Sequence, residues 1–169
     1  MTFPTIQTSR LTLRQLTTDD SSAIFALRSN PEVAAFQDRP LQQNLEESTA
    51  FITKINTGIA CKTWIFWAIT LQETSEFIGT ACLWNFSEEQ TRADLGYELL
   101  PRFQGAGYMH EALLPVIDYG FTQRHLQKID GVTHKNNDRS TQLLKKIGFT
   151  LNPDFVDGNE IMYTLKKRS

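Results

Sequence analysis

Two glycines separated by one residue stand directly before a helical pattern in the middle of the chain. They are Gly105 and Gly107, and Arg102 precedes them in the order Arg-x-x-Gly-x-Gly. Glycine lets the backbone adopt left-handed angles and approach a ligand closely. The first N–H groups of a helix have no internal partner and lie at the positive end of its dipole. These residue types at this spacing indicate a site for a phosphate or pyrophosphate group.

Other interpretations of the two glycines stay open at this point, because many such pairs are plain turns. A dinucleotide-binding fingerprint has a third small residue three positions after the second glycine, where this chain has His110. A Walker loop requires Gly-Lys-Ser/Thr, which the sequence lacks. A nicotinamide-dependent oxidoreductase is therefore the least favoured of the phosphate-binding classes.

The glycines are positioned by a strand before them and a helix after them. Apolar residues alternate at Leu95, Tyr97 and Leu99, and Pro101 ends the strand because it has no N–H to donate. From Tyr108 onward, apolar residues recur at helical spacing. The sequence therefore predicts a strand, a glycine turn and a helix in direct succession.

The rest of the chain reads as one domain, residues 1–169, of mixed α/β (α+β) class. Short polar turns join three strands into an antiparallel meander, and the strand after the long helix is parallel to the one before it. Further strands are expected at 9–16, 63–70, 77–84, 128–134, 149–155 and 160–165. Further helices are expected at about 17–27, 45–56 with Gly58 as C-cap, and 140–147 with Gly148 as C-cap.

Composition and charge favour a small enzyme over other classes. The net charge of −2 lacks the basic footprint of a nucleic-acid binder. No apolar run approaches the roughly 20 residues that a membrane span needs, and the first residues lack a signal-peptide pattern. Cys61 and Cys82 form no metal-ligand or Cys-x-x-Cys pattern, so we expect free thiols and a cytoplasmic location.

Five blocks of the sequence, in this order, resemble the RimJ/RimL-type branch of the GNAT N-acetyltransferase superfamily. They are Arg10-Leu11-Thr12-Leu13-Arg14, Ile78-Gly79-Thr80, Leu95-Gly96-Tyr97-Glu98, the glycine segment Gln104 to Ala112, and Asn137-Asp138-Arg139-Ser140 followed by Leu144 to Phe149. The resemblance implies a mixed sheet of six to seven strands, antiparallel in its N-terminal half, with a splayed parallel pair in the middle and about four helices. It also implies transfer of an acetyl group from acetyl-CoA to a primary amine, by direct attack in a ternary complex and without a metal.

The same resemblance assigns residues to the cofactor. The parallel strands are expected to splay after Glu98, which leaves backbone groups of Leu99 and Leu100 unpaired for the pantetheine arm. The expected cofactor-binding residues are Leu99, Leu100, Arg102, Gln104, Gly105, Ala106, Gly107, Tyr108 and Asn137. N-capping of the last helix is an equally sound role for Asn137.

Three residues are candidates for the chemistry of acetyl transfer. Glu98 is the first candidate for the base that removes a proton from the amine, and an exposed strand carboxylate is its alternative interpretation. His134 is the second candidate base, and a surface histidine is the alternative. Ser140 falls where relatives place a hydroxyl near the sulfur, as a hydrogen-bond donor. The amine could also arrive already neutral, with the enzyme supplying only positioning and oxyanion contacts.

The acceptor is expected to be a peptide N-terminus or a small cationic amine. The resemblance implies that the irregular region 32–43 and the helix 45–56 lie beside the acceptor site, and the alternative is that they only cover one edge of the sheet. Acidic residues could line the substrate side: Glu46, Glu47, Glu88 and Glu89. We expect no nucleic-acid or membrane partner, and a monomer or homodimer. A catalytically silent acyl-CoA-binding module is the alternative function, because the glycine segment would serve it equally well.

Overall fold

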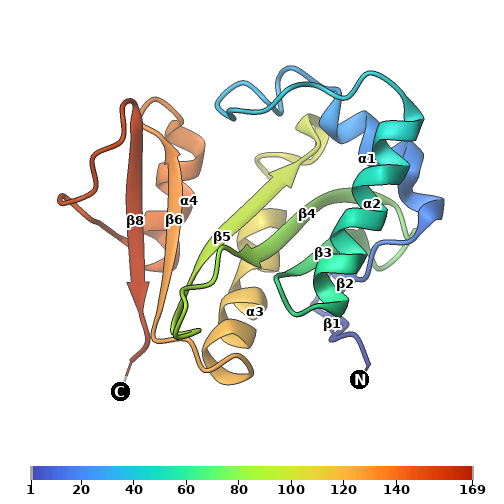
Figure 1. The fold of residues 1–169 in the computed structure, drawn as a ribbon. Helices are drawn as coiled ribbons and strands as arrows, with labels where there is room; N and C mark the ends of the chain where they lie inside the picture. The colour runs from blue at the N-terminus through green and yellow to red at the C-terminus, as the bar shows by residue number, and fades with distance from the viewer. Residues whose placement is uncertain (1, 169) are drawn as a thin grey trace.

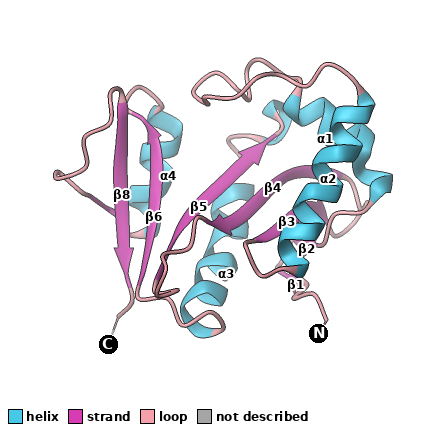
Figure 2. Ribbon diagram, in the orientation of Figure 1, coloured by secondary structure: helices cyan, strands magenta, loops and turns pink. Residues whose placement is uncertain are grey.

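The computed structural model describes residues 2–168, which form an eight-stranded sheet with helices on both faces (Figures 1 and 2). The strands are β1 (Ile6–Gln7), β2 (Leu11–Arg14), β3 (Ile65–Leu71), β4 (Phe77–Trp84), β5 (Arg92–Leu99), β6 (Lys128–His134), β7 (Thr150–Leu151) and β8 (Glu160–Lys166). The helices are α1 (Ser21–Arg28), α2 (Leu45–Ala60), α3 (Tyr108–Thr122) and α4 (Asp138–Ile147), with 3₁₀ turns η1 (Thr18–Asp20) and η2 (Pro101–Phe103).

The strand order is β1-β2-β3-β4-β5-β6-β8-β7. The first five strands pair antiparallel with their neighbours, β5 and β6 pair parallel, and β6, β8 and β7 are again antiparallel. The predicted meander and the parallel pair that follows the long helix are confirmed. The expected number of six to seven strands is too low, because β1, a strand of only two residues, is too short to show an alternating pattern.

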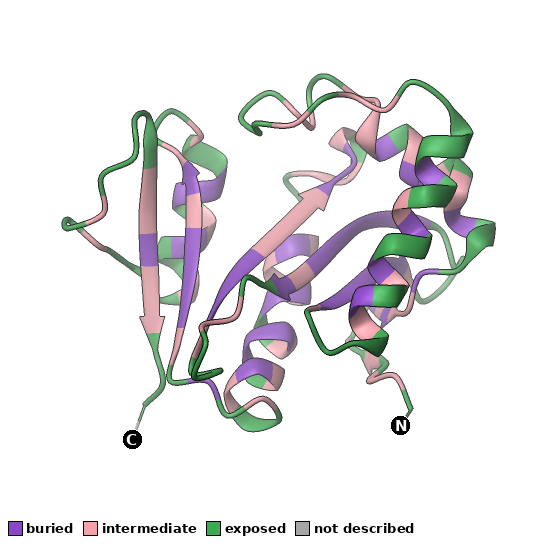
Figure 3. Cartoon of the chain, in the orientation of Figure 1, coloured by how far each residue is buried: buried purple, intermediate pink, exposed green. Residues whose placement is uncertain are grey.

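The helices divide between the two faces of the sheet. In Figure 1, α1 and α2 lie in front of β2 to β4, and α3 and α4 lie behind the sheet. Figure 3 shows buried residues along the central strands and on the helices that cover them. Their side chains form two clusters. One joins the apolar face of α3 to the sheet around Leu13 and Ile78, and the other joins α1 and α2 to Phe66 and Ala68.

Several predicted boundaries hold and others shift. The predicted strands 77–84 and 128–134 have the observed bounds, and Gly148 ends α4 with a φ of 121°. Gly58 is not a C-cap: α2 continues to Ala60, and a Cβ at Gly58 would lie 2.2 Å from the indole of Trp64. Glycine is needed there for packing. The predicted strand 149–155 is shortened to β7, because the chain turns away after Leu151.

Gly79 brings two strands together next to the glycine segment. A Cβ on Gly79 would lie 2.3 Å from the carbonyl oxygen of Glu98, so a larger residue would push β4 from β5. The ladder between β3 and β4 also shifts register beside Gly79, at Ile69/Thr70. Both the bulge and the close packing that a glycine inside a strand indicates are therefore present.

Within residues 2–168, no helix combines the length and the apolar character that crossing a membrane requires.

Candidate active site

An opening in the sheet lies between β5 and β6. The two strands are paired only at Arg92, Ala93 and Asp94, opposite Lys128, Ile129 and Asp130. From Leu95 onward the β6-facing edge of β5 has no ladder partner, and Figure 1 shows the two strands diverging. The splay was predicted after Glu98, and this position is wrong by four residues. The pattern of apolar residues continues unchanged through the point of divergence, so it carries no signal for it.

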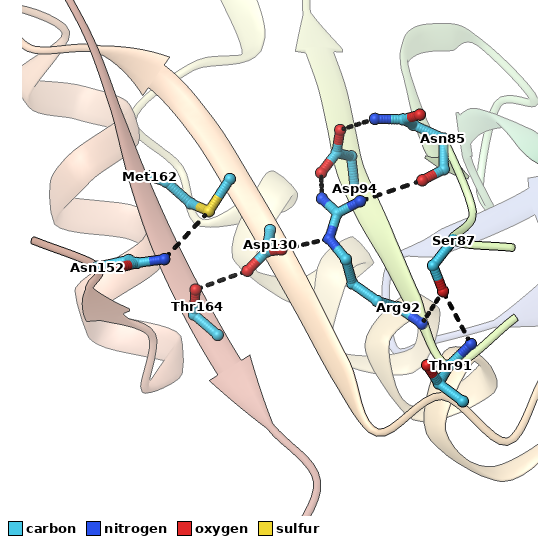
Figure 4. Close-up of polar contacts among 9 residues, drawn as sticks. All are labelled: Asn85, Ser87, Thr91, Arg92, Asp94, Asp130, Asn152, Met162 and Thr164. Carbon is cyan, nitrogen blue, oxygen red and sulfur yellow. Dashed lines mark hydrogen bonds and ion pairs between the residues drawn. The ribbon is translucent and has the colours of Figure 1, made fainter. Parts of the chain in front are cut away.

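A buried ion network fixes the point where the strands part (Figure 4). Arg92 Nε donates to Asp130 Oδ2 at 2.6 Å, and the same guanidinium contacts Asp94, which stands opposite Asp130 in the ladder. Asn85 Nδ2 donates to Asp94 at 2.9 Å, and Thr164 Oγ1 donates to Asp130 at 2.6 Å. Burial raises the pKa of Asp94, an effect that Asn85 and Arg92 oppose. The cation between two carboxylates holds β5 and β6 together at this one place.

A cavity of about 780 Å³ lies beside this opening. Its walls come from residues 97–99 of β5, from the glycine segment and the first turn of α3, and from one side of α4 between Asn137 and Lys146. Its remaining wall is formed by residues 32, 33 and 35–37, in the connection between α1 and α2. A single cavity therefore joins the predicted phosphate site to the region expected to choose the acceptor.

The glycine segment has the geometry that the sequence predicts. Gly105 and Gly107 have φ values of 84° and 82°, which side-chain-bearing residues rarely adopt. Gly107 is the N-cap of α3, and no side chain caps this helix end. The residues that begin α3, Tyr108 to His110, line the cavity together with Gly107. Their N–H groups have no partner within the helix. This arrangement fits an anionic phosphate group.

Arg10, which directly precedes β2, holds this segment in place, although no pattern in the sequence indicates this role. Its Nε donates to Glu111 at 2.7 Å, its Nη1 donates to the carbonyl of Ala106 at 3.1 Å, and its guanidinium lies 4.3 Å from the Tyr108 ring centre. Its Nη2 lies 3.5 Å from the place of a Cβ on Gly107. Arg102, predicted to add the positive charge here, is exposed and pairs with Glu76 instead.

Three of the four backbone groups predicted to be free at Leu99 and Leu100 have partners. The Leu100 N–H donates to Ile78 at 2.9 Å, and its carbonyl accepts from Phe103 at 3.0 Å. The Leu99 carbonyl accepts from Gln104 Nε2 at 2.9 Å. Leu100 is the N-cap of η2, which accounts for the partner of its carbonyl, and the Gln104 side chain reaches back to Leu99. Gln104 and Leu99 still line the cavity, so both remain able to contact a ligand there.

Ser140 and Asn137 lie at the start of α4 and line the cavity. Asn137 Oδ1 accepts from the Ser140 N–H at 3.2 Å, so the predicted N-cap is confirmed. The Ser140 hydroxyl lies 2.5 Å from the phenol oxygen of Tyr97, which comes from β5. Burial raises the pKa of Tyr97 to about 12, so this phenol stays protonated at neutral pH. Tyr97 lines the same cavity, and alternation alone had placed it only as an apolar strand residue.

Glu98 lines the cavity but is not an exposed carboxylate, since its side chain is 9% exposed. Oε1 accepts from Arg28 Nη1 at 2.9 Å, and Oε2 pairs with Arg39 Nη2. Both oxygens are therefore occupied by guanidinium donors. Neither arginine was predicted, because Arg28 ends α1 and Arg39 lies in an irregular segment without a repeating pattern.

His134 is not among the residues that line the cavity. Its Nδ1 accepts from the Asn136 N–H at 3.0 Å, so in the neutral ring the proton is on Nε2. The ring packs against Phe36, with centroids 5.3 Å apart. The structure thus places the two candidate bases on opposite sides of the opening.

The remaining predicted acceptor residues lie elsewhere. The cavity lining includes Glu32 and Glu98, but none of Glu46, Glu47, Glu88 and Glu89.

Among the tryptophans, Trp67 is fully buried and Trp84 is 48% exposed. Cys61 is exposed, and burial raises the pKa of Cys82 to about 12. In the part of the chain that the structure describes, no group of three or more His, Cys, Asp or Glu side chains is arranged to hold a metal ion.

Comparisons with known proteins identify the family. Residues 10–150 match the family model described as acetyltransferase (GNAT) domain. The uncharacterized N-acetyltransferase YoaA of Bacillus subtilis is 35% identical over 147 residues, which cover 87% of this chain and 83% of YoaA. An acetyltransferase structure from Agrobacterium tumefaciens aligns with a TM-score of 0.82 at 25% identity, covering 99% of this chain and 96% of that one.

A further solved structure has the same fold and contains coenzyme A. RimL, the ribosomal L7/L12 alpha-N-protein acetyltransferase, was solved in complex with coenzyme A and aligns with a TM-score of 0.84 at 18% identity, covering 96% of this chain and 98% of that one. At this identity the likeness concerns the fold. The family match, the relative and the cavity at the splayed strands agree, and the chain belongs to the GNAT acetyltransferase family as an N-acetyltransferase.

Proposed function

We propose that the protein transfers the acetyl group of acetyl-CoA to a primary amine, which attacks the thioester directly in a ternary complex. The observation that carries this proposal is the single cavity that extends from the glycine segment, past residues 97–99 of β5, to residues 32–37. One end has the features of a phosphate site and the other belongs to the segment expected to contact the acceptor. Both substrates can therefore meet beside β5.

The cofactor lies with its pyrophosphate on the start of α3 in this proposal. The N–H groups around Gly105 to Tyr108 supply the hydrogen bonds, and the helix dipole favours the negative charge. Gln104 and Asn137 line the path between the phosphate end and Ser140. The Asn137 oxygen is used by the N-cap, so its amide nitrogen is the group that contacts the pantetheine arm.

The amine attacks in its neutral form, and positioning and electrostatics carry the step. Both oxygens of Glu98 accept from arginines, and His134 lies outside the cavity. We therefore assign the removal of the amine proton to water in the cavity rather than to either side chain. A nitrogen–carbon bond forms, the thioester oxygen gains the charge, and the carbon–sulfur bond breaks when the tetrahedral intermediate collapses.

Ser140 is the donor to the leaving thiolate in this scheme. The Tyr97 phenol stays protonated because burial raises its pKa to about 12. Either hydroxyl can donate in the 2.5 Å contact between Tyr97 and Ser140, and in this scheme the phenol donates to the Ser140 oxygen. The Ser140 proton is then free to point toward the sulfur. A serine hydroxyl does not ionise here, so it stabilises the sulfur charge by a hydrogen bond, and solvent supplies the proton of the free thiol.

Direct attack is favoured over a covalent enzyme intermediate because of the state of Cys82. Burial raises the pKa of its thiol to about 12, and the thiolate is the nucleophilic form. Cys61 is exposed at the end of α2 and does not line the cavity. Mass spectrometry of the protein after incubation with acetyl-CoA alone is expected to find no added acetyl group on either cysteine.

The alternative function is an acyl-CoA-binding module without turnover. Thiol release from acetyl-CoA, measured with a panel of amines, separates the two. The panel holds a peptide with a free N-terminus, the same peptide N-formylated, a small diamine and an acidic amino acid. We expect release with the free peptide or the diamine and none with the blocked peptide. Tight acetyl-CoA binding without release for any amine supports the module instead.

A further inference from the structure

The connection between α1 and α2 crosses the opening between β5 and β6. We call residues 29–44 the crossover segment. In Figure 1 it extends from α1 over the end of β5 toward β6. Five of its residues line the cavity. An acceptor that reaches the cavity from this side must pass along the crossover segment.

Arg39 anchors the crossover segment to β5. Its Nη2 pairs with Glu98, and its Nη1 donates to the Arg28 carbonyl at 3.1 Å. The same carbonyl accepts from the Gln42 N–H at 3.1 Å. Because Arg28 Nη1 also donates to Glu98 at 2.9 Å, these contacts form a closed ring that joins the end of α1, the crossover segment and β5.

A second contact fixes the tip of the segment on the other strand. Phe36 lies against His134 at the end of β6, although the Phe36 side chain is 46% exposed. The crossover segment therefore has one contact on each side of the opening. The contact on β5 is ionic and well buried, and the contact on β6 is apolar and open to solvent.

The ionic contact is shielded from water to an unusual degree for a surface segment. The side chains of Glu98, Arg39 and Arg28 are 9%, 12% and 19% exposed. The Arg28 guanidinium also lies 4.1 Å from the Phe51 ring centre, on α2. Nε of Arg28 and Nε of Arg39 are buried without a hydrogen-bond partner among the described residues. Buried ion pairs of this kind add little net stability, and their best use is to fix one geometry.

We propose that Glu98 and Arg39 are positioning residues for the acceptor. Glu98 holds Arg39, and Arg39 holds the crossover segment at the distance from β5 that confines the amine beside the thioester. The inference rests on the proposed function. It assigns Glu98 a different role from that of a base, since both of its oxygens serve the two arginines.

Three variants test this inference: Arg39→Gln, Glu98→Gln and the double variant. We expect each single variant to raise the amine KM about 10-fold, with kcat within about threefold and acetyl-CoA affinity unchanged, because a lost positioning contact acts on acceptor binding. The effects of the two single variants on KM should not add in the double variant, since the Arg39–Glu98 contact is lost in all three. Arg39→Lys keeps the positive charge but not the planar guanidinium with its several donors. Its amine KM is therefore expected to lie between those of wild type and Arg39→Gln.

Hydrogen exchange of residues 29–44 gives a readout that does not depend on activity. Deuterium uptake in this segment is expected to rise in Arg39→Gln and in Glu98→Gln, and to stay at the wild-type level in the control Arg124→Gln. Arg124 lies over the aromatic ring of Phe86, as Arg28 does over that of Phe51. It takes no part in the contacts among Arg28, Arg39 and Glu98.

Two outcomes overturn the inference. The first is unchanged uptake in residues 29–44 in both single variants. The second is a kcat that falls about 10²–10⁴-fold in Glu98→Gln while Arg39→Gln behaves as wild type, because that pattern belongs to a base. If no amine supports transfer, the proposed function fails, and the exchange measurement still decides whether Glu98 and Arg39 hold the segment.

Discussion

The phenol oxygen of Tyr97 and the hydroxyl of Ser140 lie 2.5 Å apart, and they come from opposite sides of the opening between β5 and β6. Tyr97 belongs to β5, and Ser140 lies in the first turn of α4, which packs on β6. Both side chains line the cavity. The pair therefore places two hydroxyl groups where a ligand lying in the opening must pass.

Removal of the Ser140 hydroxyl is expected to slow acetyl transfer. In Ser140→Ala, kcat should fall by about 10–100-fold, because a hydrogen bond to a charged group contributes roughly 1.5–3 kcal/mol. In Tyr97→Phe, the decrease should be smaller, since Ser140 remains. Acetyl-CoA affinity, measured by calorimetry, should change little in either variant. Tyr119→Phe is the matched control, because Tyr119 packs on Trp67 and does not line the cavity. A Ser140→Ala enzyme with wild-type kcat contradicts the assigned donor.

Substitution of Gly107 tests the phosphate site. Gly107→Val should weaken acetyl-CoA binding, because a β-branched residue is strained at a φ of 82° and its side chain meets Arg10 Nη2. Gly158→Ala is the control: Gly158 also has a positive φ of 59°, has open space around it and lies outside the cavity. If Gly107→Val folds, as judged by circular dichroism, and binds acetyl-CoA as wild type does, the phosphate site lies elsewhere.

Arg10 and Arg102 are expected to differ in their effect on the cofactor. Arg10→Gln should weaken acetyl-CoA binding by about 10-fold, since it removes a charge-assisted contact to Glu111 and the contact to the Ala106 carbonyl, each of the order of 1 kcal/mol. Arg102→Gln should stay within about twofold, because Arg102 is exposed and paired with Glu76. Fluorescence titration with coenzyme A compares the two. The reverse order would restore the role first predicted for Arg102.

The pH dependence of stability should report on Asp20. Burial alone raises its pKa, but the hydrogen bonds from Arg14 and from the Thr17 N–H outweigh burial, and the net pKa is lowered from its ordinary value of 3.8. A lowered folded-state pKa gives stability that is present above about pH 4 and is lost as the pH falls through the folded-state value. The difference in unfolding free energy between wild type and Asp20→Asn, from urea titrations, should therefore be largest near neutral pH and shrink below pH 4. A difference that grows with acid contradicts this sign.

The sequence predicts the elements around the glycine segment well because local rules govern them. A strand ended by Pro101, two glycines with positive φ and an amphipathic α3 each follow from the residues at those positions. Short polar turns between the strands extend this to the meander, and the residues Asn137 to Ser140 extend it to the start of α4.

The contacts that complete the site depend on residues far apart in sequence. Arg10 and Glu111 are 101 positions apart, and Arg39 and Glu98 are 59 positions apart. No periodicity in either segment indicates a partner, and surface arginines usually have none. The divergence of β5 from β6 was misplaced for a similar reason, since it is set by the ion network of Arg92 with Asp94 and Asp130 rather than by the apolar pattern.

The short ladder between β5 and β6 also has a consequence for how the protein unfolds. Three residues of each strand connect the sheet β1–β5 to the sheet formed by β6, β8 and β7. Amides of β6 and β8 that lie beyond this ladder are therefore expected to open in partial unfolding events that leave β3 and β4 intact. A ligand that contacts both strands must dissociate before the strands separate. Its binding free energy therefore adds to the free energy of this partial unfolding. The thermal midpoint of the carboxy-terminal strands should then rise with coenzyme A concentration until both parts of the sheet melt together.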